Sequence, residues 1–401
     1  MEMDLYDQLH ARGFIKQCTN PELVKQILSK DKTTFYIGFD PTADCLHIGH
    51  LLPLMVMSWL QKAGHQPIII MGGGTAMIGD PSGKDKTRDM LTQAQIEHNL
   101  QSQKRLFAKV VNIESAIICN NADWLTSLGY INFLRDIGKH FSVNKMIKAE
   151  GARQRLDRDQ GYSFIEFNYH LLQSYDFLVL HQKYNCNLQI GGDDQWFHLC
   201  GGVDLVRREE GKQVFAFTIP LLTTASGKKM GKTEKGAVWI DEQKLSPFEY
   251  YQYWYNVHDA DVIKFMKLFT YLPLEDIEKF ANLKGAAINQ AKHKLALEAT
   301  AVIHGAEAAK KAQQAAKSAF GGGQSADMPS HQATLPLLIT EILVSTGMCK
   351  SKSEARRLIK GGGVKIDFGS GKEAVKDINA SLHKEAIVWA GKKKCVQITS
   401  S

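Results

Sequence analysis

The sequence contains no apolar stretch that approaches the roughly 18–20 residues a helix needs to cross a bilayer. Its start, MEMDLYDQLH, carries acidic side chains where a signal or transit peptide would carry basic ones. The 7 cysteines are scattered, odd in number and never arranged as C-x-x-C, so neither a disulfide framework nor a zinc ribbon is indicated. We therefore expect a soluble protein of the reducing cytoplasm, with no membrane segment.

Positive charge is concentrated near the C-terminus. The 401 residues carry a net charge of +7, and residues 335–401 hold 12 Lys and Arg against 6 Asp and Glu. This asymmetry suggests a polyanion-binding appendage on a nearly neutral body, although a merely solvated lysine-rich surface is the alternative. With 44% hydrophobic residues, the chain has material for two or three domains with separate cores.

The first half of the chain alternates short apolar runs with helical patterns. Strands separated by helices predict an α/β domain of the Rossmann-like type, whose parallel sheet binds ligands at the carboxyl ends of its strands. The expected strands are residues 33–40, 66–74 and 186–192, and the expected helices are residues 51–64, 164–180 and 194–211.

The second half changes character. After SPFEYYQYW the patterns are helical only, and residues 285–320 are so rich in Ala, Lys and Gln that helix propensity alone supports them. The segment GGGQSADMPSHQA shows no periodicity and has the composition of a linker. We predict a Rossmann-like domain (1–245), an all-α domain (246–320), a linker (321–334) and a small basic α+β domain (335–401).

A pair of histidines stands where the first predicted strand passes into a helix, in YIGFDPTADCLHIGH (36–50). His47 and His50 share one helix face at a helix N-terminus, which favours phosphate. Gly49 costs the helix up to ~1 kcal/mol against Ala, and would let a flat base lie on the backbone. The alternatives are two surface histidines, or a zinc site that includes Cys45.

Two glycine-rich segments carry cations. MGGGTAMIGDPSGK (71–84) fails the Walker A and G-x-G-x-x-G spacings, but places Asp80 where it can hold an ammonium group, followed by Lys84 and Arg88. SGKKMGKT (226–233) offers flexible lysines that can close over a polyphosphate. Either segment could also be an ordinary solvated loop.

Polar residues line one face of the predicted helix 163–180. Tyr169, Gln173 and Asp176 stand at i, i+4 and i+7, within a narrow arc at about 100° per residue. If buried, they need partners, which a polar small molecule or a core network would supply. In QIGGDDQW (189–196), a carboxylate at the turn can accept from ribose hydroxyls or simply cap the next helix.

Taken together and in order, these segments resemble the class I aminoacyl-tRNA synthetases, with residues 47–50 matching the HIGH signature and residues 229–233 the KMSKS loop. Within that class the chain resembles the bacterial tyrosyl family over nearly its whole length. The resemblance implies a homodimer that activates L-tyrosine with ATP and Mg²⁺, without a metal site of its own, and transfers tyrosine to the 3′ end of tRNA(Tyr).

The resemblance also assigns roles to matching positions. Tyr36 and Asp176 would hold the tyrosine hydroxyl, and Gln195 would lie near the carboxylate. Tyrosine would be bound by Tyr36, Gly38, Asp40, Asp80, Tyr169, Gln173, Asp176 and Gln195. ATP or the departing pyrophosphate would be contacted by Thr42, His47, Gly49, His50, Lys84, Arg88, Gly192, Asp194, Lys229, Lys232 and Thr233.

The basic tail resembles the S4 type of RNA-binding fold. In SKSEARRLIKGGGVKID (351–367), Ser351 and Glu354 have capping-box spacing, and Gly361 can end the helix. The predicted phosphate contacts are Arg356, Arg357, Lys360, Lys392, Lys393 and Lys394.

The chain departs from the family pattern at Gly231 and Thr233 in the KMSKS-like loop, and at Asp193, Phe197 and His198 near the substrate carboxylate. Two other functions remain open. A tryptophanyl enzyme shares the ATP signatures but would not be expected to carry the Tyr36/Asp176 pair or the S4-like tail. A non-catalytic RNA-binding protein built on the same scaffold would not need the intact histidines and lysines.

Overall fold

The structure is a computed structural model, and it describes residues 3–30, 32–80, 91–157, 162–224, 230, 232–233, 236–321, 330–368, 371–391 and 394–400. The chain divides into two compact units. The first is Met1–Asp241 with Lys267–Phe269, and the second is Glu242–Met266 with Thr270–Ser401. The first unit ends close to the predicted domain boundary at residue 245.

A five-stranded parallel sheet forms the centre of the first unit, with the strand order β3-β2-β1-β4-β5. Its strands are β1 (Thr34–Phe39), β2 (Gln66–Met71), β3 (Ile117–Asn120), β4 (Leu188–Gly192) and β5 (Phe215–Ile219). The predicted α/β class is therefore confirmed. The almost uninterrupted apolar run of β2 is typical of a strand that is covered on both faces.

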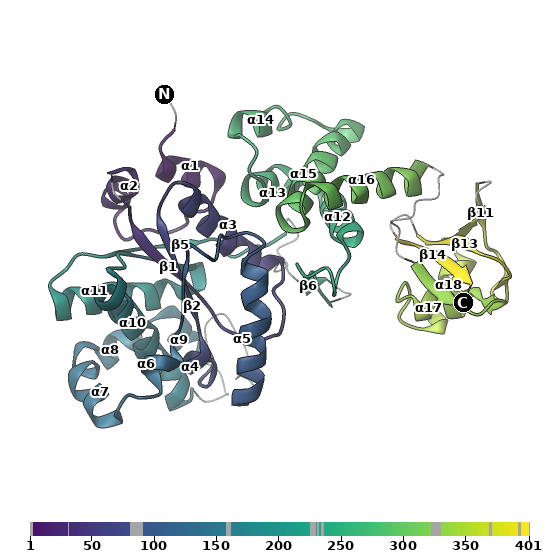
Figure 1. Cartoon of the computed structure of the whole chain (residues 1–401). Coiled ribbons are helices and arrows are strands. Elements are labelled where there is room, and N and C mark those ends of the chain that lie inside the picture. Colours follow the sequence, from purple (N-terminus) through teal and green to yellow (C-terminus); the bar gives the residue numbers. More distant parts are fainter. Residues whose placement is uncertain are drawn as a thin grey trace. The chain divides into compact units, whose positions relative to one another are not determined.

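Helices cover both faces of this sheet. Figure 1 shows α10 and α11 on one side of the strands and α3 and α5 on the other. The helices and 3-10 turns of the unit are α1 (Leu5–Arg12), α2 (Pro21–Lys30), α3 (Ile48–Lys62), α4 (Gly73–Ala76), α5 (Gln93–Phe107), α6 (Ala122–Leu125), α7 (Tyr130–Asp136), η1 (Gly138–His140), α8 (Val143–Met146), α9 (Glu150–Leu156), α10 (Phe164–Tyr184), η2 (Asp193–Gln195) and α11 (Trp196–Glu210). The boundaries of α10 follow from its caps. Ser163 and Glu166 form a capping box at its start, and Asn185 ends it in the left-handed conformation.

The second unit begins with helices only, as predicted. They are α12 (Pro247–Tyr255), η3 (Asp259–Asp261), α13 (Val262–Phe269), α14 (Leu274–Glu278), η4 (Gly285–Ala287), α15 (Ile288–His304) and α16 (Ala306–Gly321). The end of α13 belongs by its contacts to the first unit. Gly305, with φ of 83°, separates α15 from α16 inside the Ala-rich segment, because this backbone conformation suits glycine and ends a helix.

The C-terminal segment folds around its own core, which includes Ile339, Leu343, Ile359 and Val388. Its helices are α17 (Ile339–Ser345) and α18 (Lys352–Lys360), and its strands are β8 (Ser330–Ala333), β9 (Leu337–Leu338), β10 (Val364–Asp367), β11 (Lys372–Ala374), β12 (Ser381–Leu382), β13 (Ala386–Ala390) and β14 (Lys394–Ser400). The predicted small α+β domain is present, and its main sheet has the order β11-β10-β13-β14-β8.

The predicted linker is wrong at its C-terminal end. Residues Ser330–Ala333 form β8, which pairs in parallel with β14. This strand lies at the edge of its sheet and is held by backbone hydrogen bonds, so its sequence SHQA shows no apolar alternation to reveal it.

In the described part of the chain, no helix is both long and apolar enough to cross a membrane.

Candidate active site

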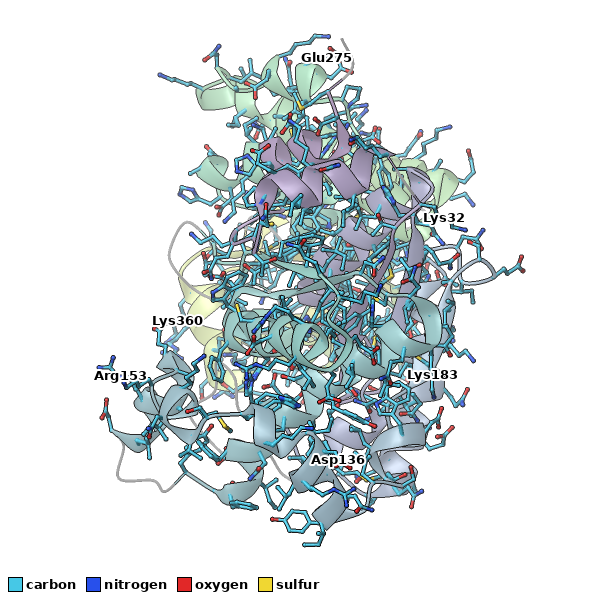
Figure 2. All side chains as sticks on the ribbon, turned by 90° about the vertical axis from the view of Figure 1, so that its left-hand side faces the viewer. Lys32, Asp136, Arg153, Lys183, Glu275 and Lys360 are labelled. Atoms are coloured by element: carbon cyan, nitrogen blue, oxygen red, sulfur yellow. The ribbon has the colours of Figure 1, made fainter. Side chains whose placement is uncertain are left out.

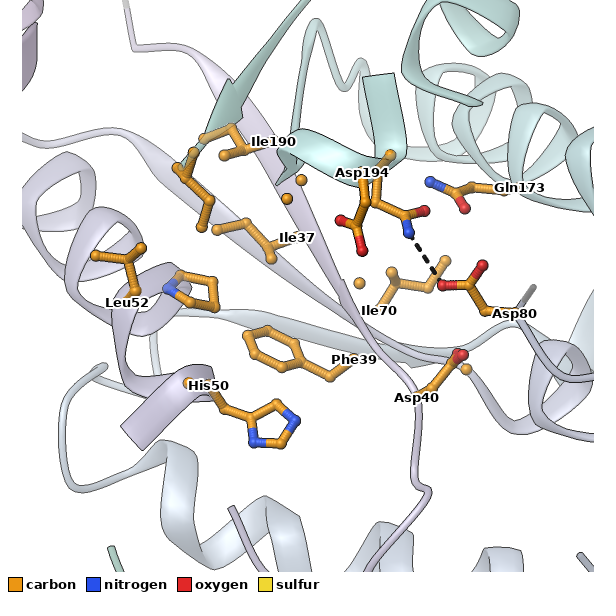
Figure 3. Close-up of a pocket in the computed structure, with 18 of the residues that line it drawn as sticks. Ile37, Phe39, Asp40, His50, Leu52, Ile70, Asp80, Gln173, Ile190 and Asp194 are labelled. Carbon is orange, nitrogen blue, oxygen red and sulfur yellow. Dashed lines mark hydrogen bonds between the residues drawn. The ribbon is translucent and has the colours of Figure 1, made fainter. Parts of the chain in front are cut away.

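A cavity of about 440 Å³ opens at the carboxyl ends of β1 and β4, the predicted place for a ligand in such a sheet. Figure 3 shows His50 toward one end of it, and Asp80 and Gln173 toward the other. Apart from the five residues named below, every predicted tyrosine or nucleotide residue lines this cavity: Tyr36, Gly38, Asp40, Thr42, His47, Gly49, His50, Asp80, Tyr169, Gln173, Asp176, Gly192, Asp194 and Gln195.

Five predicted residues of the ATP site cannot be placed in this way. Lys84, Arg88 and Lys229 lie outside the described residues. Lys232 and Thr233 are described by their backbone, which forms β6 (Lys232–Thr233) and pairs with β7 (Gly236–Ala237). Their roles stay predictions.

A buried phenol and a buried carboxylate stand among the residues that line the cavity. Tyr36 and Asp176 both line the cavity, and they are only 2% and 4% exposed. Burial and the charge of Asp176 raise the pKa of Tyr36 well above its ordinary value. Among the described residues, the Tyr36 hydroxyl has no hydrogen-bond partner. A buried hydroxyl without a partner is costly, so this part of the cavity is suited to a ligand with a polar atom.

The Asp176 carboxylate is held by two donors that the sequence did not reveal. Trp124 Nε1 donates to Oδ1 at 2.8 Å, and Asn121 Nδ2 donates to Oδ2 at 3.0 Å. These bonds fix the orientation of the carboxylate and leave it capacity to accept a further bond, because an ionised carboxylate has about four lone-pair sites. No local pattern links these donors to the polar face of α10, but the pair Asn120-Asn121 at a strand end was a usable signal.

Burial raises the pKa of Asp176 from 3.8 to about 7, although the bonds from Asn121 and Trp124 lower it. The charge of Asp40 adds to the increase. The folded protein therefore retains a proton on this group that the unfolded chain has lost. Its contribution to folding stability consequently falls as pH rises from about 4 to about 7. The buried carboxylate thus lowers the folding stability at neutral pH, and such a strongly shifted pKa is typical of functional positions.

The same network continues to the neighbouring strand. Asn121 Nδ2 also lies 3.1 Å from Thr75 Oγ1, and Thr75 Oγ1 donates to Asp40 Oδ1 at 3.0 Å. The Asn121 side-chain oxygen accepts from Gly74 N at 2.8 Å. Asp40 and Asp176 are thus positioned by one connected set of hydrogen bonds.

A second group of polar side chains also lines the cavity. Asp80, Tyr169, Gln173 and Gln195 all line it. Gln195 Nε2 donates to Asp80 Oδ2 at 3.0 Å, the bond that is dashed in Figure 3. A carboxylate that lies beside a phenol and two amides is a suitable seat for an ammonium group.

The two histidines of the HIGH segment cap helix α3 reciprocally. His47 Nδ1 accepts from Gly49 N at 3.0 Å, and His47 N donates to His50 Nδ1 at 3.2 Å. Because both Nδ1 atoms accept, this geometry places the ring proton of each neutral imidazole on Nε2. Burial, and secondarily His47, lowers the pKa of His50 to about 3, so His50 stays neutral throughout the physiological range.

This arrangement argues against the zinc alternative. Both Nδ1 atoms are engaged by backbone N–H groups, and Cys45 is fully buried with Sγ directed toward Leu46 O. In the described ranges, no cluster of three His, Cys, Asp or Glu side chains is placed to bind a metal ion. A Cβ at Gly49 would lie 2.6 Å from His47 Cε1, so the cap itself requires a glycine there.

The stem of the lysine-bearing loop is anchored to the histidine turn, a contact that the sequence did not indicate. Ile48 N donates to Val238 O, and Ile240 N donates to Leu46 O, each at 3.0 Å. His47 and Trp239 form the bridge between these two hydrogen bonds. The backbone that leaves the loop therefore runs beside the start of α3.

Two of the departures from the family pattern have structural partners. Asp193 Oδ1 accepts from Gln17 Nε2 at 2.7 Å and from Thr218 Oγ1 at 2.8 Å, whereas the neighbouring Asp194 lines the cavity. His198 does not line the cavity, and its Nδ1 is 3.0 Å from that of His170.

The predicted RNA-binding residues Arg356, Arg357 and Lys360 lie on α18, and Lys394 begins β14. Arg357 and Lys394 line one hollow in this small domain, and Lys394 Nζ donates to Met348 O at 2.5 Å. Lys392 and Lys393 lie outside the described residues.

Comparisons with known proteins agree with this geometry. The family model for class I tRNA synthetases (W and Y) matches residues 28–321, and that for the S4 domain matches residues 340–369. A tyrosine–tRNA ligase of Acetivibrio thermocellus is 50% identical over 407 residues, which cover 96% of this chain and 99% of that relative. A tyrosine–tRNA ligase of Clostridium botulinum strain Hall is 51% identical over 395 residues and covers 97% and 96%.

Solved structures share the fold. A C-terminally truncated mitochondrial tyrosyl-tRNA synthetase of Aspergillus nidulans superposes with a TM-score of 0.71 at 28% identity, covering 79% of this chain and 94% of that one. A tyrosyl-tRNA synthetase from Archaeoglobus fulgidus, solved with L-tyrosine, gives a TM-score of 0.58 at 17% identity, covering 77% of this chain and 100% of that one, a likeness of fold alone.

Proposed function

Because this chain belongs to the tyrosine–tRNA ligases, a family of class I tRNA synthetases, we propose that its 440 Å³ cavity is the place where tyrosine reacts with ATP. The family, the enzyme class and the reaction predicted from the sequence are confirmed. The tyrosine carboxylate attacks the α-phosphorus of ATP, which yields tyrosyl-adenylate and pyrophosphate. The terminal ribose of tRNA(Tyr) then takes the tyrosyl group.

We propose that the tyrosine hydroxyl binds between Tyr36 and Asp176. The observation that carries this assignment is the buried, unpartnered Tyr36 hydroxyl beside a carboxylate whose orientation is fixed. The substrate phenol can donate to Asp176 and accept from Tyr36, so a single oxygen satisfies both groups. Phenylalanine would leave both unpaired in a buried place, which makes its binding costly.

The rest of the substrate is assigned by charge. Asp80, Tyr169 and Gln173 would bind the ammonium group, and Gln195 would lie near the carboxylate, so that the reacting oxygen points toward the nucleotide seat. The Nε2–H groups of His47 and His50 would donate to phosphate oxygens at the N-terminus of α3. Adenine would lie over Gly49, and ribose would bind at Asp194.

The loop lysines would act on the developing charge. Negative charge grows on the pyrophosphate as it leaves, and Lys229 and Lys232 would stabilise it there more strongly than in bound ATP. We propose that Mg²⁺ enters with the phosphates of ATP, which are the hard oxygen ligands it prefers, and helps to neutralise their charge. No residue of this chain is assigned to it.

The alternative substrate is tryptophan, because the matching family model includes both amino acids. An indole has no hydroxyl to pair with Tyr36 and Asp176, which favours tyrosine. ATP–pyrophosphate exchange by the full chain with tyrosine, tryptophan and phenylalanine tests this. Exchange that is fastest with tryptophan would refute the proposed pocket, and no exchange with any amino acid would favour a non-catalytic RNA-binding protein.

Selectivity for tyrosine over phenylalanine should increase between about pH 6 and about pH 8, because Asp176, with a pKa of about 7, accepts most strongly when ionised. The measurement is kcat/KM for exchange with each amino acid across this range. Both substrates share the ammonium and carboxylate groups, so their ratio isolates the hydroxyl. A constant ratio would show that ionisation of Asp176 does not control recognition.

We propose that the enzyme is a homodimer joined through α7–α10. Large apolar side chains are exposed on these consecutive elements, and Asp136 and Arg153, labelled in Figure 2, mark α7 and α9. The most exposed of them are Tyr130, Ile131, Val143, Leu156, Phe164 and Ile165, with Ile131 exposed by 72%. So many large apolar side chains exposed on consecutive elements are typical of an interface.

Ile131→Asp should shift the protein from dimer to monomer, because burying an unpaired carboxylate in an apolar interface is unfavourable. Sedimentation velocity measures the change. The control is Tyr184→Asp at the opposite end of α10, also partly exposed, which should leave the dimer intact. A wild-type protein that sediments as a monomer would exclude this interface.

We propose that residues 246–320 and 335–401 contact tRNA, and that the basic face of α18 binds its phosphates. The double substitution of Arg357 and Lys360 by Ala should weaken tRNA binding. It should also reduce the slope of log K for tRNA binding against log salt concentration by about 1 for each lost phosphate contact. Exchange without tRNA should not change. Lys376→Ala, at an exposed lysine outside the predicted set, serves as the control, and an unaltered salt slope in the double variant would exclude α18.

A cytoplasmic location, where tRNA and ATP are found, is part of the same proposal.

A further inference from the structure

Two histidines form a buried pair between α10 and α11. Their Nδ1 atoms are 3.0 Å apart, and His170 and His198 are only 5% and 8% exposed. Neither lines the active-site cavity, and none of the roles proposed above uses them. A single proton lies between the two Nδ1 atoms, so one neutral ring donates and the other accepts. Burial lowers the pKa of both rings, which keeps the pair uncharged.

The surroundings hold the pair in one arrangement. Phe197 stacks on His170 with ring centroids 4.1 Å apart, and Phe141 packs edge-on at 5.2 Å. A Cβ at Gly201 would lie 2.2 Å from His170 Cε1, so α11 approaches this ring through a bare backbone. His170 therefore has little freedom to move, and it fixes the ring of His198 through the shared proton.

Of the two histidines, His198 is the one that contacts a residue of the active-site cavity. Its ring packs edge-on against the ring of Tyr169, with centroids 5.6 Å apart. Asp80 is near enough for its charge to raise the pKa of His198 against the larger effect of burial. Tyr169 and Asp80 are thus two titratable groups near the pair, and both line the cavity.

We propose that His170 and His198 are positioning residues for tyrosine, acting as a neutral hydrogen-bonded pair that holds Tyr169 against the ammonium site. This rests on the proposed place of the ammonium group. The printed contacts of the pair lead to Tyr169 and Asp80 at the proposed ammonium site, so its loss should affect the binding of tyrosine through its ammonium group and should not affect ATP. It also gives a use to His198, which departs from the family pattern.

His170→Phe and His198→Phe keep an aromatic ring, slightly larger than imidazole, and remove the hydrogen bond. Each should raise KM for tyrosine in ATP–pyrophosphate exchange by roughly 5- to 10-fold, the size expected for one buried hydrogen bond, and leave KM for ATP unchanged. The double variant should match the single variants rather than multiply their effects, because the pair acts as a unit. Competition by tyramine, which retains the ammonium group, should weaken in parallel, whereas competition by 3-(4-hydroxyphenyl)propanoate, which lacks it, should not.

His65→Phe is the matched control. This buried histidine, whose Nδ1 accepts from Thr33 N at 3.2 Å, does not line the cavity, so its replacement should lower the melting temperature without changing either KM. Equal rises of both KM values in the His170 and His198 variants, or a loss of stability alone, would overturn the proposal. Asp80→Asn separates the two possible failures. If it leaves KM for tyrosine unchanged, the proposed ammonium site is wrong, and if it alone raises that KM, only the role of the histidine pair is wrong.

Discussion

Replacing Asp176 with Ala should reduce tyrosine-dependent ATP–pyrophosphate exchange by about 10²- to 10³-fold, which corresponds to ~3–4 kcal/mol of lost transition-state binding. The substitution removes a charged acceptor for the substrate hydroxyl. It also leaves the donors of Asn121 and Trp124 without their partner in a buried site. The measured quantity is kcat/KM for exchange with tyrosine.

The same variant should lose most of its preference for tyrosine, because phenylalanine never used the missing acceptor. Exchange with phenylalanine should therefore change much less than exchange with tyrosine. Asp123→Ala, at an exposed aspartate on the neighbouring helix α6, is the control for a lost carboxylate and should preserve both activities. An Asp176→Ala enzyme that is folded and still selects tyrosine as the wild type does would remove Asp176 from recognition.

Replacing Lys232 with Ala should slow adenylate formation by about 10²-fold, with little change in the dissociation constant for tyrosine. The ammonium group of Lys232 is proposed to interact with charge that exists mainly in the transition state, so ground-state binding should be preserved. The stem of the loop is anchored to the histidine turn through Ile48 and Ile240, and this turn is the proposed phosphate site. Rapid-quench measurement of adenylate formation, combined with equilibrium binding of tyrosine, separates the two quantities.

Lys212→Ala provides the comparison for Lys232→Ala, since Lys212 is an exposed lysine on the same unit and outside the cavity. It should leave both the rate of adenylate formation and tyrosine binding unaltered. If Lys232→Ala instead weakened tyrosine binding as much as it slowed the reaction, the loop would contribute to ground-state binding, and its role in the transition state would have to be given up.

The parts of the fold that the sequence predicted are those where one local pattern determines the structure. The apolar run of β2 and the strand-turn-helix pattern around His47 are examples. In the parallel sheet, the strands that were missed are the two edge strands, β3 and β5; β3 is only partly buried, whereas β5 is buried throughout. The edge strand β8 was likewise taken for linker. The partly buried edge strands β3 and β8 depend on backbone pairing with a neighbour, which side-chain pattern records poorly, whereas the apolar run of β5 was a usable signal.

The candidate site shows the same division. Helical periodicity was enough to place Tyr169, Gln173 and Asp176 on one face, and all three line the cavity. Asn121 and Trp124 bond to Asp176 across 55 and 52 positions of sequence, and no periodicity connects residues so far apart. The link between the loop stem and the start of α3 is also a long-range backbone contact, which only the folded chain reveals.

The central assignment is that one phenolic oxygen joins Tyr36 and Asp176, and a crystal structure of the enzyme with L-tyrosine tests it most directly. We expect that oxygen within hydrogen-bonding distance, about 2.5–3.0 Å, of both the Tyr36 hydroxyl and an Asp176 carboxylate oxygen. A tyrosine bound with its ring elsewhere, or with its hydroxyl away from these two side chains, would contradict the account.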